Sequence, residues 1–157
     1  MNFFLIAPLG RNNVPAVTAA VCSLLSEKGC GIYAAAPDSG HFPPQVVITD
    51  AATVCSQCDM ILCIGGDGTI IDGAHYSAGF GLPVLGINAG RLGFLAQVEP
   101  RQADKAFDRI LNGDYTIEER FGLSLSRESR AGEELLVSYA LNDIVLTKPV
   151  TTNIIDL

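Results

Sequence analysis

The sequence MILCIGGDGT at residues 60–69 decides the fold, because an apolar run passes directly into a glycine-rich loop. Residues 60–64 are apolar at every position, which is typical of a parallel strand buried on both faces. Residues 68–78 then have a helical pattern. In open parallel sheets ligands bind at the carboxyl ends of strands, where glycines let backbone amides approach a phosphate. This stretch therefore predicts a buried strand that ends in a phosphate-binding loop.

Strand and helix patterns alternate around this stretch through the first 113 residues. Further strands are predicted at 2–8, 31–36 and 82–87, further helices at 14–28 and 101–111, and an exposed loop at 37–44. The helix at 101–111 has an apolar side made of Ala103, Ala106, Phe107, Ile110 and Leu111. Such alternation predicts an α/β fold with an open, mostly parallel, Rossmann-like sheet and helices on both faces.

The pattern changes after residue 114. Strands are predicted at 115–126 and 135–146 with a polar turn at 127–134, so this segment is expected to be β-rich. The chain stops in a strand-like run at 153–157 without a turn or a cap. We therefore predict an α/β nucleotide-binding catalytic domain at 1–147, and at 148–157 the start of a truncated, β-rich second domain.

The charge of the chain excludes several classes of partner. The net charge is −7 and the Lys and Arg residues are scattered, so neither a nucleic acid nor an anionic membrane is an expected partner. The apolar residues 2–8 lack a preceding basic stretch, which argues against a signal peptide and predicts a soluble, cytoplasmic protein. Because basic residues are few, a bound phosphate is expected to be held by backbone amides and a divalent cation.

The cysteines do not form a recognisable framework. Their odd number and irregular spacing predict free thiols, at Cys22, Cys30, Cys55, Cys58 and Cys63. Cys55 and Cys58 have the two-residue gap of metal or redox pairs, but no second pair or histidine cluster accompanies them to complete four zinc ligands. The sequence therefore predicts no metal site made by the protein alone.

Asp67 is the one carboxylate inside the glycine-rich loop. A carboxylate this close to a phosphate is unfavourable unless it has a task. It can accept the proton of an attacking hydroxyl, or help to hold the magnesium ion that bridges the donor phosphates. Alternatively, it caps the helix that begins near Gly68. The residues alone leave these roles open. The loop is not a Walker A motif, which excludes P-loop chemistry, and it does not match the Gly-x-Gly-x-x-Gly fingerprint, so hydride transfer lacks its usual support.

Three motifs give the chain a family resemblance. Residues 65–69 are the Gly-Gly-Asp-Gly-Thr motif found in NAD kinases, in diacylglycerol and sphingosine kinases and, more loosely, in phosphofructokinases. The sequence GINAGRLGFL at 86–95 resembles the Asn-x-Gly-x-Leu-Gly-Phe-Leu stretch of NAD kinases, and Asn142-Asp143 resembles their Asn-Glu/Asp pair. Diacylglycerol kinases have an Asn-Glu pair almost directly after the loop, where this chain has IIDGAH at 70–75. The chain thus resembles the amino-terminal domain of the ATP-NAD kinases.

This resemblance implies a reaction and a set of site residues. The reaction is transfer of the terminal phosphate of ATP to the 2′-hydroxyl of the adenosine ribose of NAD, giving NADP, with Mg²⁺ or another divalent cation bound to ATP. Polyphosphate is an alternative donor. Asp67 is the implied catalytic base, and the implied binding residues are Gly66, Asp67, Gly68, Thr69, Asn88, Gly90, Phe94, Asn142 and Asp143.

Each carried-over residue also has a structural alternative. Phe94 can belong to the core, Asn88 and Gly90 can make a turn after a strand, and Asn142 with Asp143 can form an Asx turn. Two alternative functions stay open as well. They are a kinase of another acceptor in the same superfamily and a non-catalytic nucleotide-binding fragment. Because the resemblance implies a second domain that completes the dinucleotide site and joins the full-length protein into homo-oligomers, the isolated chain is expected to be inactive.

Overall fold

The computed structural model describes residues 1–11, 13–36, 40–90, 93–96, 98–128, 134–141 and 143–145. The chain divides into two compact units, Met1–Glu118 and Glu119–Leu157. The first unit contains, in order, β1 (Asn2–Ile6), α1 (Val14–Glu27), β2 (Gly31–Ala34), β3 (Val47–Ile48), α2 (Ala51–Gln57), β4 (Met60–Gly65), α3 (Asp67–Phe80), β5 (Val84–Asn88), the 3-10 turn η1 (Pro100–Gln102) and α4 (Ala103–Leu111). The second contains β6 (Leu123–Glu128) and β7 (Glu134–Ala140), which pair antiparallel.

The first unit is built on a parallel five-stranded sheet in the order β3-β2-β1-β4-β5. The chain fills one side of β1 first, with β2 and β3, and then the other side, with β4 and β5. The direction of winding therefore changes between β1 and β4. Ligands in open α/β sheets bind at the carboxyl edge next to such a switch point.

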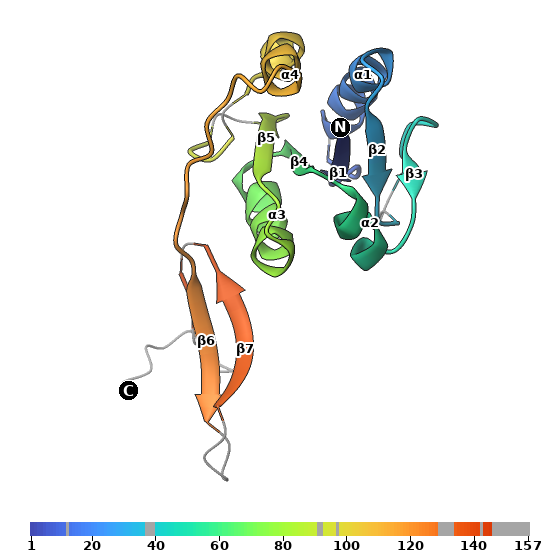
Figure 1. Cartoon of the computed structure of the whole chain (residues 1–157). Coiled ribbons are helices and arrows are strands. Elements are labelled where there is room, and N and C mark those ends of the chain that lie inside the picture. Colours follow the sequence, from blue (N-terminus) through green and yellow to red (C-terminus); the bar gives the residue numbers. More distant parts are fainter. Residues whose placement is uncertain are drawn as a thin grey trace. The chain divides into compact units, whose positions relative to one another are not determined.

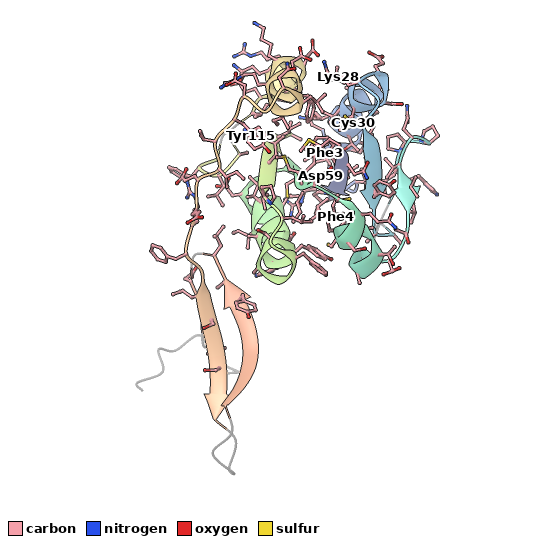
Figure 2. The ribbon with its side chains drawn as sticks, viewed as in Figure 1. Phe3, Phe4, Lys28, Cys30, Asp59 and Tyr115 are labelled. Carbon is pink, nitrogen blue, oxygen red and sulfur yellow. The ribbon has the colours of Figure 1, made fainter. Side chains whose placement is uncertain are left out.

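Helices cover both faces of this sheet, as predicted (Figure 1). Helices α1 and α4 share one apolar cluster with one face, and α2 and α3 share a second cluster with the other. Successive residues of β1 point to opposite faces, since side chains alternate along a strand. Phe3 and Phe4 of β1 are labelled in Figure 2. Phe3 meets Phe107 of α4 edge to face at 5.7 Å between ring centroids, and Phe4 meets Tyr76 of α3 in the same way at 5.0 Å.

Strand β4 lies between β1 and β5, and the sequence predicted it closely. All six of its residues are buried, as expected for a strand covered by helices on both sides. The α/β class, the parallel sheet and the helices on both faces are confirmed. The predicted strands at 2–8, 31–36 and 82–87 correspond to β1, β2 and β5. Strands β1 and β2 begin at the predicted residue and end two residues earlier, whereas β5 begins two residues later and ends one residue later.

Two short elements were missed by the sequence analysis. They are β3, a two-residue strand with both residues exposed, and α2. Helix α2 has a start signal that was overlooked, because the carboxylate of Asp50 accepts the backbone N–H of Thr53 at 2.9 Å. Its seven residues are too few for a clear apolar period, so the sequence pattern did not predict this helix.

The predicted strand at 115–126 is wrong in its first part. Regular pairing begins only at Leu123, opposite Ala140. Ile117 is 61% exposed and Phe121 is 92% exposed, so the apolar residues that suggested a strand here do not face a core within the described part of the chain. The polar turn at 127–134 falls largely outside the described residues, as does the strand-like run at 153–157. The division predicted between residues 147 and 148 also lies there and stays a prediction.

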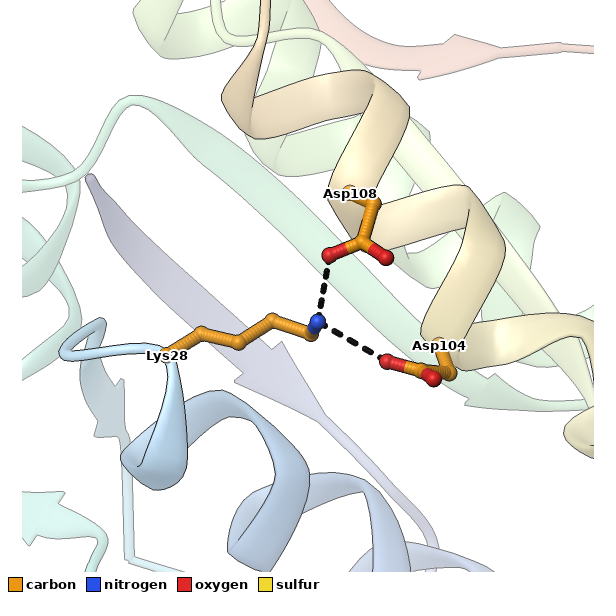
Figure 3. A network of polar contacts seen from close by, with 3 residues as sticks. All are labelled: Lys28, Asp104 and Asp108. Carbon is orange, nitrogen blue, oxygen red and sulfur yellow. Dashed lines mark hydrogen bonds and ion pairs between the residues drawn. The ribbon is translucent and has the colours of Figure 1, made fainter.

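A polar cluster joins the two helices of one face. Lys28, at the end of α1, contacts Asp104 at 2.8 Å and Asp108 at 2.5 Å, both on α4 (Figure 3). The two aspartates are four residues apart on a helix, so their charges repel each other unless a cation lies between them. The side chain of Lys28 is only 18% exposed, and its two hydrogen bonds raise its pKa to about 12.

Lys28→Met is expected to lower the midpoint of thermal unfolding, because the aspartates lose their shared cation while the apolar stem is kept. The group has a raised pKa, so its contribution is fully present below the ordinary lysine value of 10.5 and is lost as the pH rises through about 12. Thermal unfolding of both proteins between pH 8 and pH 11.5 checks this. A gap between their midpoints that stays constant over this range would contradict it.

Among the described residues, no helix combines the length and the apolar character needed to cross a membrane.

Candidate functional site

The glycine-rich loop and the turn after β5 lie side by side at the carboxyl edge of the sheet. Strands β4 and β5 are paired in parallel with Gly65 opposite Asn88. One residue later the backbone N–H of Ala89 donates to the carbonyl oxygen of Gly65 at 3.0 Å. The motifs at 65–69 and 86–95 therefore leave neighbouring strands at the same level, next to the switch point of the sheet.

Asp67 joins these two motifs through its carboxylate. One oxygen, Oδ2, accepts the backbone N–H of Phe94 at 3.0 Å, and the other, Oδ1, accepts the backbone N–H of Leu95 at 3.0 Å. Asp67 is the first residue of α3, where a negative charge is favourable, but the helix cap is Gly66 and has no side-chain cap bond. The carboxylate thus reaches across to the neighbouring loop instead of capping its own helix.

Gly93 leaves the space that the Asp67 carboxylate occupies. A Cβ atom at residue 93 would lie 2.3 Å from Oδ1 and 2.8 Å from Oδ2 of Asp67, which is far inside contact distance. Within the motif at 86–95, Gly93 had no predicted role of its own. The two motifs follow adjacent strands, which indicates that their loops meet. This order does not indicate which residues of the two loops are in contact.

The two amides also set the ionisation of Asp67. Their hydrogen bonds, from Phe94 and then from Leu95, lower its pKa below the ordinary aspartate value. A group with a lowered pKa stabilises the fold above its unfolded pKa, and that contribution is lost as the pH falls through the folded value. Asp67 is therefore a carboxylate, not a carboxylic acid, at neutral pH.

The glycine-rich loop is closely packed at Gly65 and Thr69 and open at Gly66 and Gly68. The backbone N–H of Thr69 donates to the carbonyl oxygen of Gly66 at 3.0 Å, and its side chain is buried. A Cβ atom at Gly65 would lie 2.2 Å from Oγ1 of Thr69, so this glycine lets α3 start directly against β4. A Cβ atom at Gly66 or Gly68 would meet nothing within 4 Å, so both glycines border open space.

The turn after β5 has both a structural and an exposed part. The side-chain oxygen of Asn88 accepts the backbone N–H of Gly90 at 3.0 Å. Asn88 and Gly90 therefore form a turn after the strand, as the structural alternative for these residues expected. Phe94 is 98% exposed, so the alternative that assigned it to the core is wrong. Arg91 and Leu92, also in this motif, lie outside the described residues.

The third motif belongs to the second unit. Asp143 is exposed, and Asn142 lies outside the described residues. The expected binding roles of Asn142 and Asp143 stay predictions.

The cysteines are free thiols, as predicted. Cys55 and Cys58 are buried, and burial is the main cause that raises the pKa of both, to about 12 for Cys58. Such thiols are protonated at neutral pH and react poorly. In the part of the chain that is described, no three His, Cys, Asp or Glu side chains come together to hold a metal ion.

Gly93→Ala is expected to displace the Asp67 carboxylate from the Phe94 and Leu95 amides, because the new methyl group needs the space of Oδ1. The pKa of Asp67 should then rise towards the ordinary value of 3.8, as followed by carboxyl-carbon NMR titration. Gly79→Ala is the matched control, since a Cβ atom there meets nothing within 4 Å on the same helix as Asp67. An unchanged titration of Asp67 in Gly93→Ala would show that the contact is not maintained in solution.

The fold and the edge described above define a class of protein, namely a parallel α/β domain in which a Gly-Gly-Asp-Gly-Thr loop is bound to the turn of the next strand. Comparison with known proteins narrows the class. The family model described as the ATP-NAD kinase N-terminal domain matches residues 18–115, well over half of the chain. This chain belongs to the ATP-NAD kinase family.

Individual relatives agree with the family match. Over 109 residues the chain is 39% identical to the NAD kinase of Ruminiclostridium cellulolyticum, covering 69% of this chain and 38% of that protein. It is 33% identical to the NAD kinase of Natranaerobius thermophilus over 97% of this chain and 53% of that protein. The chain therefore spans about half or less of the length of these two relatives.

A solved structure has the same fold. The crystal structure of yeast NADH kinase complexed with NADH superimposes with a TM-score of 0.74 at 16% sequence identity. The match covers 90% of this chain and 44% of the yeast chain.

Proposed function

We propose that this chain carries the phosphate-transfer site of an NAD kinase, which moves the terminal phosphate of ATP to the 2′-hydroxyl of the adenosine ribose of NAD. The observation that supports it best is the pair of hydrogen bonds from the Phe94 and Leu95 amides to Asp67. These bonds hold a single ionised carboxylate between the two loops that carry the family's motifs. The two proposed substrates, ATP and NAD, are those in the name of the family to which the chain belongs.

In this proposal Asp67 accepts the proton of the attacking ribose hydroxyl. Its lowered pKa keeps it ionised and ready to accept, but also makes it a weak base. A sugar hydroxyl is far too weak an acid to lose its proton to such a base in the ground state. The proton therefore moves late, when the new oxygen–phosphorus bond is largely formed and the hydroxyl has become acidic. Each carboxylate oxygen has a second lone pair, so acceptance of an amide leaves room for the hydroxyl.

The phosphates of ATP are expected at the start of α3. The first amides of a helix lack partners inside the helix and favour an anion. The amide of Thr69 already donates to Gly66, so Gly66 and Gly68, which border open space, are the better placed of the three predicted loop contacts. Mg²⁺ is typically held by substrate phosphates together with one or two carboxylates, and Asp67 is the carboxylate in this loop. When bound, the ion neutralises charge on the transferred phosphate.

The dinucleotide is expected on the β5 side of Asp67. Phe94 offers a fully exposed aromatic face to a base or nicotinamide ring, and Asn88 with Gly90 forms the turn that leads to it. Asn142 and Asp143 offer an amide and a carboxylate, which suit a ribose diol because it both donates and accepts. The cytoplasmic location also stays a prediction.

The acceptor is tested directly by offering a full-length enzyme that carries this domain ATP with Mg²⁺ and one acceptor at a time. NAD should be phosphorylated in preference to fructose 6-phosphate or diacylglycerol, as measured by NADP formation with an NADP-specific dehydrogenase and by ADP release. Replacing ATP with polyphosphate in the same assay identifies the donor. ADP release with a lipid or sugar acceptor but not with NAD would move the chain to another branch of the superfamily.

The rate of the chain itself is a separate expectation. We expect NADP formation at least tenfold slower than by a full-length relative such as the Natranaerobius thermophilus enzyme, of which the chain spans 53%. Phosphate transfer depends on holding the acceptor in line, and an acceptor held by only part of its site loses most of that advantage. Equal rates, compared at saturating NAD and ATP, would show that residues 1–157 suffice for the reaction.

A further inference from the structure

Gly86, in the middle of β5, is a buried glycine whose missing side chain would face α3. Side chains alternate along a strand, and the flanking residues Leu85 and Ile87 pack in the apolar cluster shared with α1 and α4. Residue 86 therefore faces the other side of the sheet, which α2 and α3 cover. A glycine weakens the interior of a strand and often marks the close approach of another backbone. The atoms around Gly86 show which elements make this approach.

Two different elements approach Gly86 from the α3 side. A Cβ atom at residue 86 would lie 2.6 Å from Cδ1 and 3.1 Å from Cγ1 of Ile70, which is on α3. It would also lie 3.3 Å from the Cα atom of Ala96, which is backbone and cannot rotate away as a side chain can. The missing side chain thus lets α3 and the segment at Ala96 both lie directly against β5.

The segment around Ala96 is also fixed to β5 by its backbone. The N–H of Val98 donates to the carbonyl oxygen of Gly86 at 3.2 Å, and the N–H of Asn88 donates to the carbonyl oxygen of Val98 at 2.8 Å. Val98 thereby forms a parallel bridge with β5. The segment that supplies the amides to Asp67 is therefore anchored to β5 beside Gly86.

The two elements that meet at Gly86 are the same two that meet at Asp67. Ile70 lies three residues after Asp67 in α3, so the two side chains project from the same side of the helix. Ala96 directly follows the two residues whose amides hold the Asp67 carboxylate. Those two amides lower the pKa of Asp67, and the amide of Ala96 adds a smaller effect in the same direction. The apolar contact at Gly86 and the polar contact at Asp67 thus link the same elements, one turn of α3 apart.

We propose that Gly86 is a positioning residue for Asp67. The absence of a side chain at residue 86 sets the distance between the start of α3 and the segment at 94–96, and so holds the carboxylate against its amides. This inference rests on the proposed function, in which that carboxylate accepts the proton of the ribose hydroxyl. Displacing a reacting group by about 1 Å can lower a rate by roughly 10²-fold. Gly86 itself supplies no group to the reaction and acts only through the position of Asp67.

Gly86→Ala tests this role, because the added methyl group pushes both elements away from β5. The pKa of Asp67, followed by carboxyl-carbon NMR titration of this chain, should rise towards 3.8 as the amide bonds lengthen. In a full-length enzyme that carries this domain, kcat should fall by about three- to tenfold, because the backbone at Ala96 has to move by only a few tenths of an ångström. Ile70→Val removes Cδ1, the atom nearest to the new methyl group, so combining it with Gly86→Ala should reverse part of both changes.

Gly31→Ala is the matched control. Gly31 is also a strand glycine, and a Cβ atom there would collide with the side chain of Asn2, but at the opposite edge of the sheet from Asp67. This variant should lower the urea midpoint of unfolding and leave both the titration of Asp67 and kcat unchanged. Urea unfolding of every variant measures the general loss of stability.

A second substitution covers the case in which Gly86→Ala does not fold. Ile70→Ala removes the α3 side of the same contact and should also raise the pKa of Asp67. Its control is Ile110→Ala, since Ile110 is a buried isoleucine on α4, on the opposite face of the sheet.

The outcomes separate this inference from the proposed function. A raised pKa of Asp67 in Gly86→Ala, reversed in part by Ile70→Val, supports the positioning role even if kcat is unchanged, in which case only the proposed role of Asp67 in the reaction fails. An unchanged titration of Asp67 in a folded Gly86→Ala variant would overturn the inference. A rise of the same size in Gly31→Ala would overturn it as well, because the effect would then reflect a general loosening of the fold.

Discussion

Asp67→Asn is expected to lower kcat by about 10²- to 10⁴-fold in a full-length enzyme that carries this domain, which is the usual contribution of a general base. The substitution removes the proton acceptor and the negative charge. It also has a structural effect, because both carboxylate oxygens accept backbone amides. In asparagine one of these positions becomes an NH₂ group, which faces an N–H donor and cannot accept from it.

Two measurements separate the chemical effect from the structural one. The first is kcat with saturating NAD and ATP, and the second is the urea midpoint of unfolding of the same variant. Asp59→Asn is the control, since Asp59 also accepts a backbone amide, from Asn2 at 2.7 Å, but at the opposite end of the sheet. If Asp67→Asn kept near-normal kcat and only lowered the urea midpoint, Asp67 would be a structural link and the proposed mechanism would be wrong.

Phe107→Ala is expected to destabilise the first unit by about 3–5 kcal/mol, the usual cost of removing a buried phenyl ring. Phe107 is fully buried in α4, and its ring meets Phe3 of β1 edge to face. Because a domain of this size has a total stability of about 5–15 kcal/mol, this single change should remove a large part of it.

The measurement is urea unfolding followed by circular dichroism. Leu111→Ala is the matched control on the same helix, because Leu111 is 38% exposed and should cost about 1 kcal/mol or less. Equal losses of stability for the two variants would mean that α4 is not fixed to the sheet through Phe107.

The apolar side of this helix illustrates what the sequence could predict. The 3.6-residue period correctly selected Ala103, Phe107 and Ile110 as buried. It also selected Leu111, which lies at the rim because the apolar stripe of a helix is wider than its contact with the sheet. Periodicity indicates which side of a helix faces inwards, but the edge of the contact depends on the neighbouring elements.

The candidate site was predictable in part for a similar reason. The positions of the two motifs after neighbouring strands follow from the alternation of strands and helices, so their meeting at one edge was expected. The contact of Asp67 with the Phe94 and Leu95 amides was not, because the conformation of a loop of this kind depends on tertiary contacts.

The fit of Gly93 against Asp67 means that the two motifs are not free to vary independently. A library randomised at both positions should show strong epistasis, in which the size tolerated at residue 93 depends on the side chain at residue 67. A shorter side chain at residue 67 should allow alanine or serine at residue 93. The carboxylate oxygen Oδ1, which would lie 2.3 Å from a Cβ atom at residue 93, is then absent. Such variants would keep the fold and lose the carboxylate, which separates selection for folding from selection for chemistry at the same pair of residues.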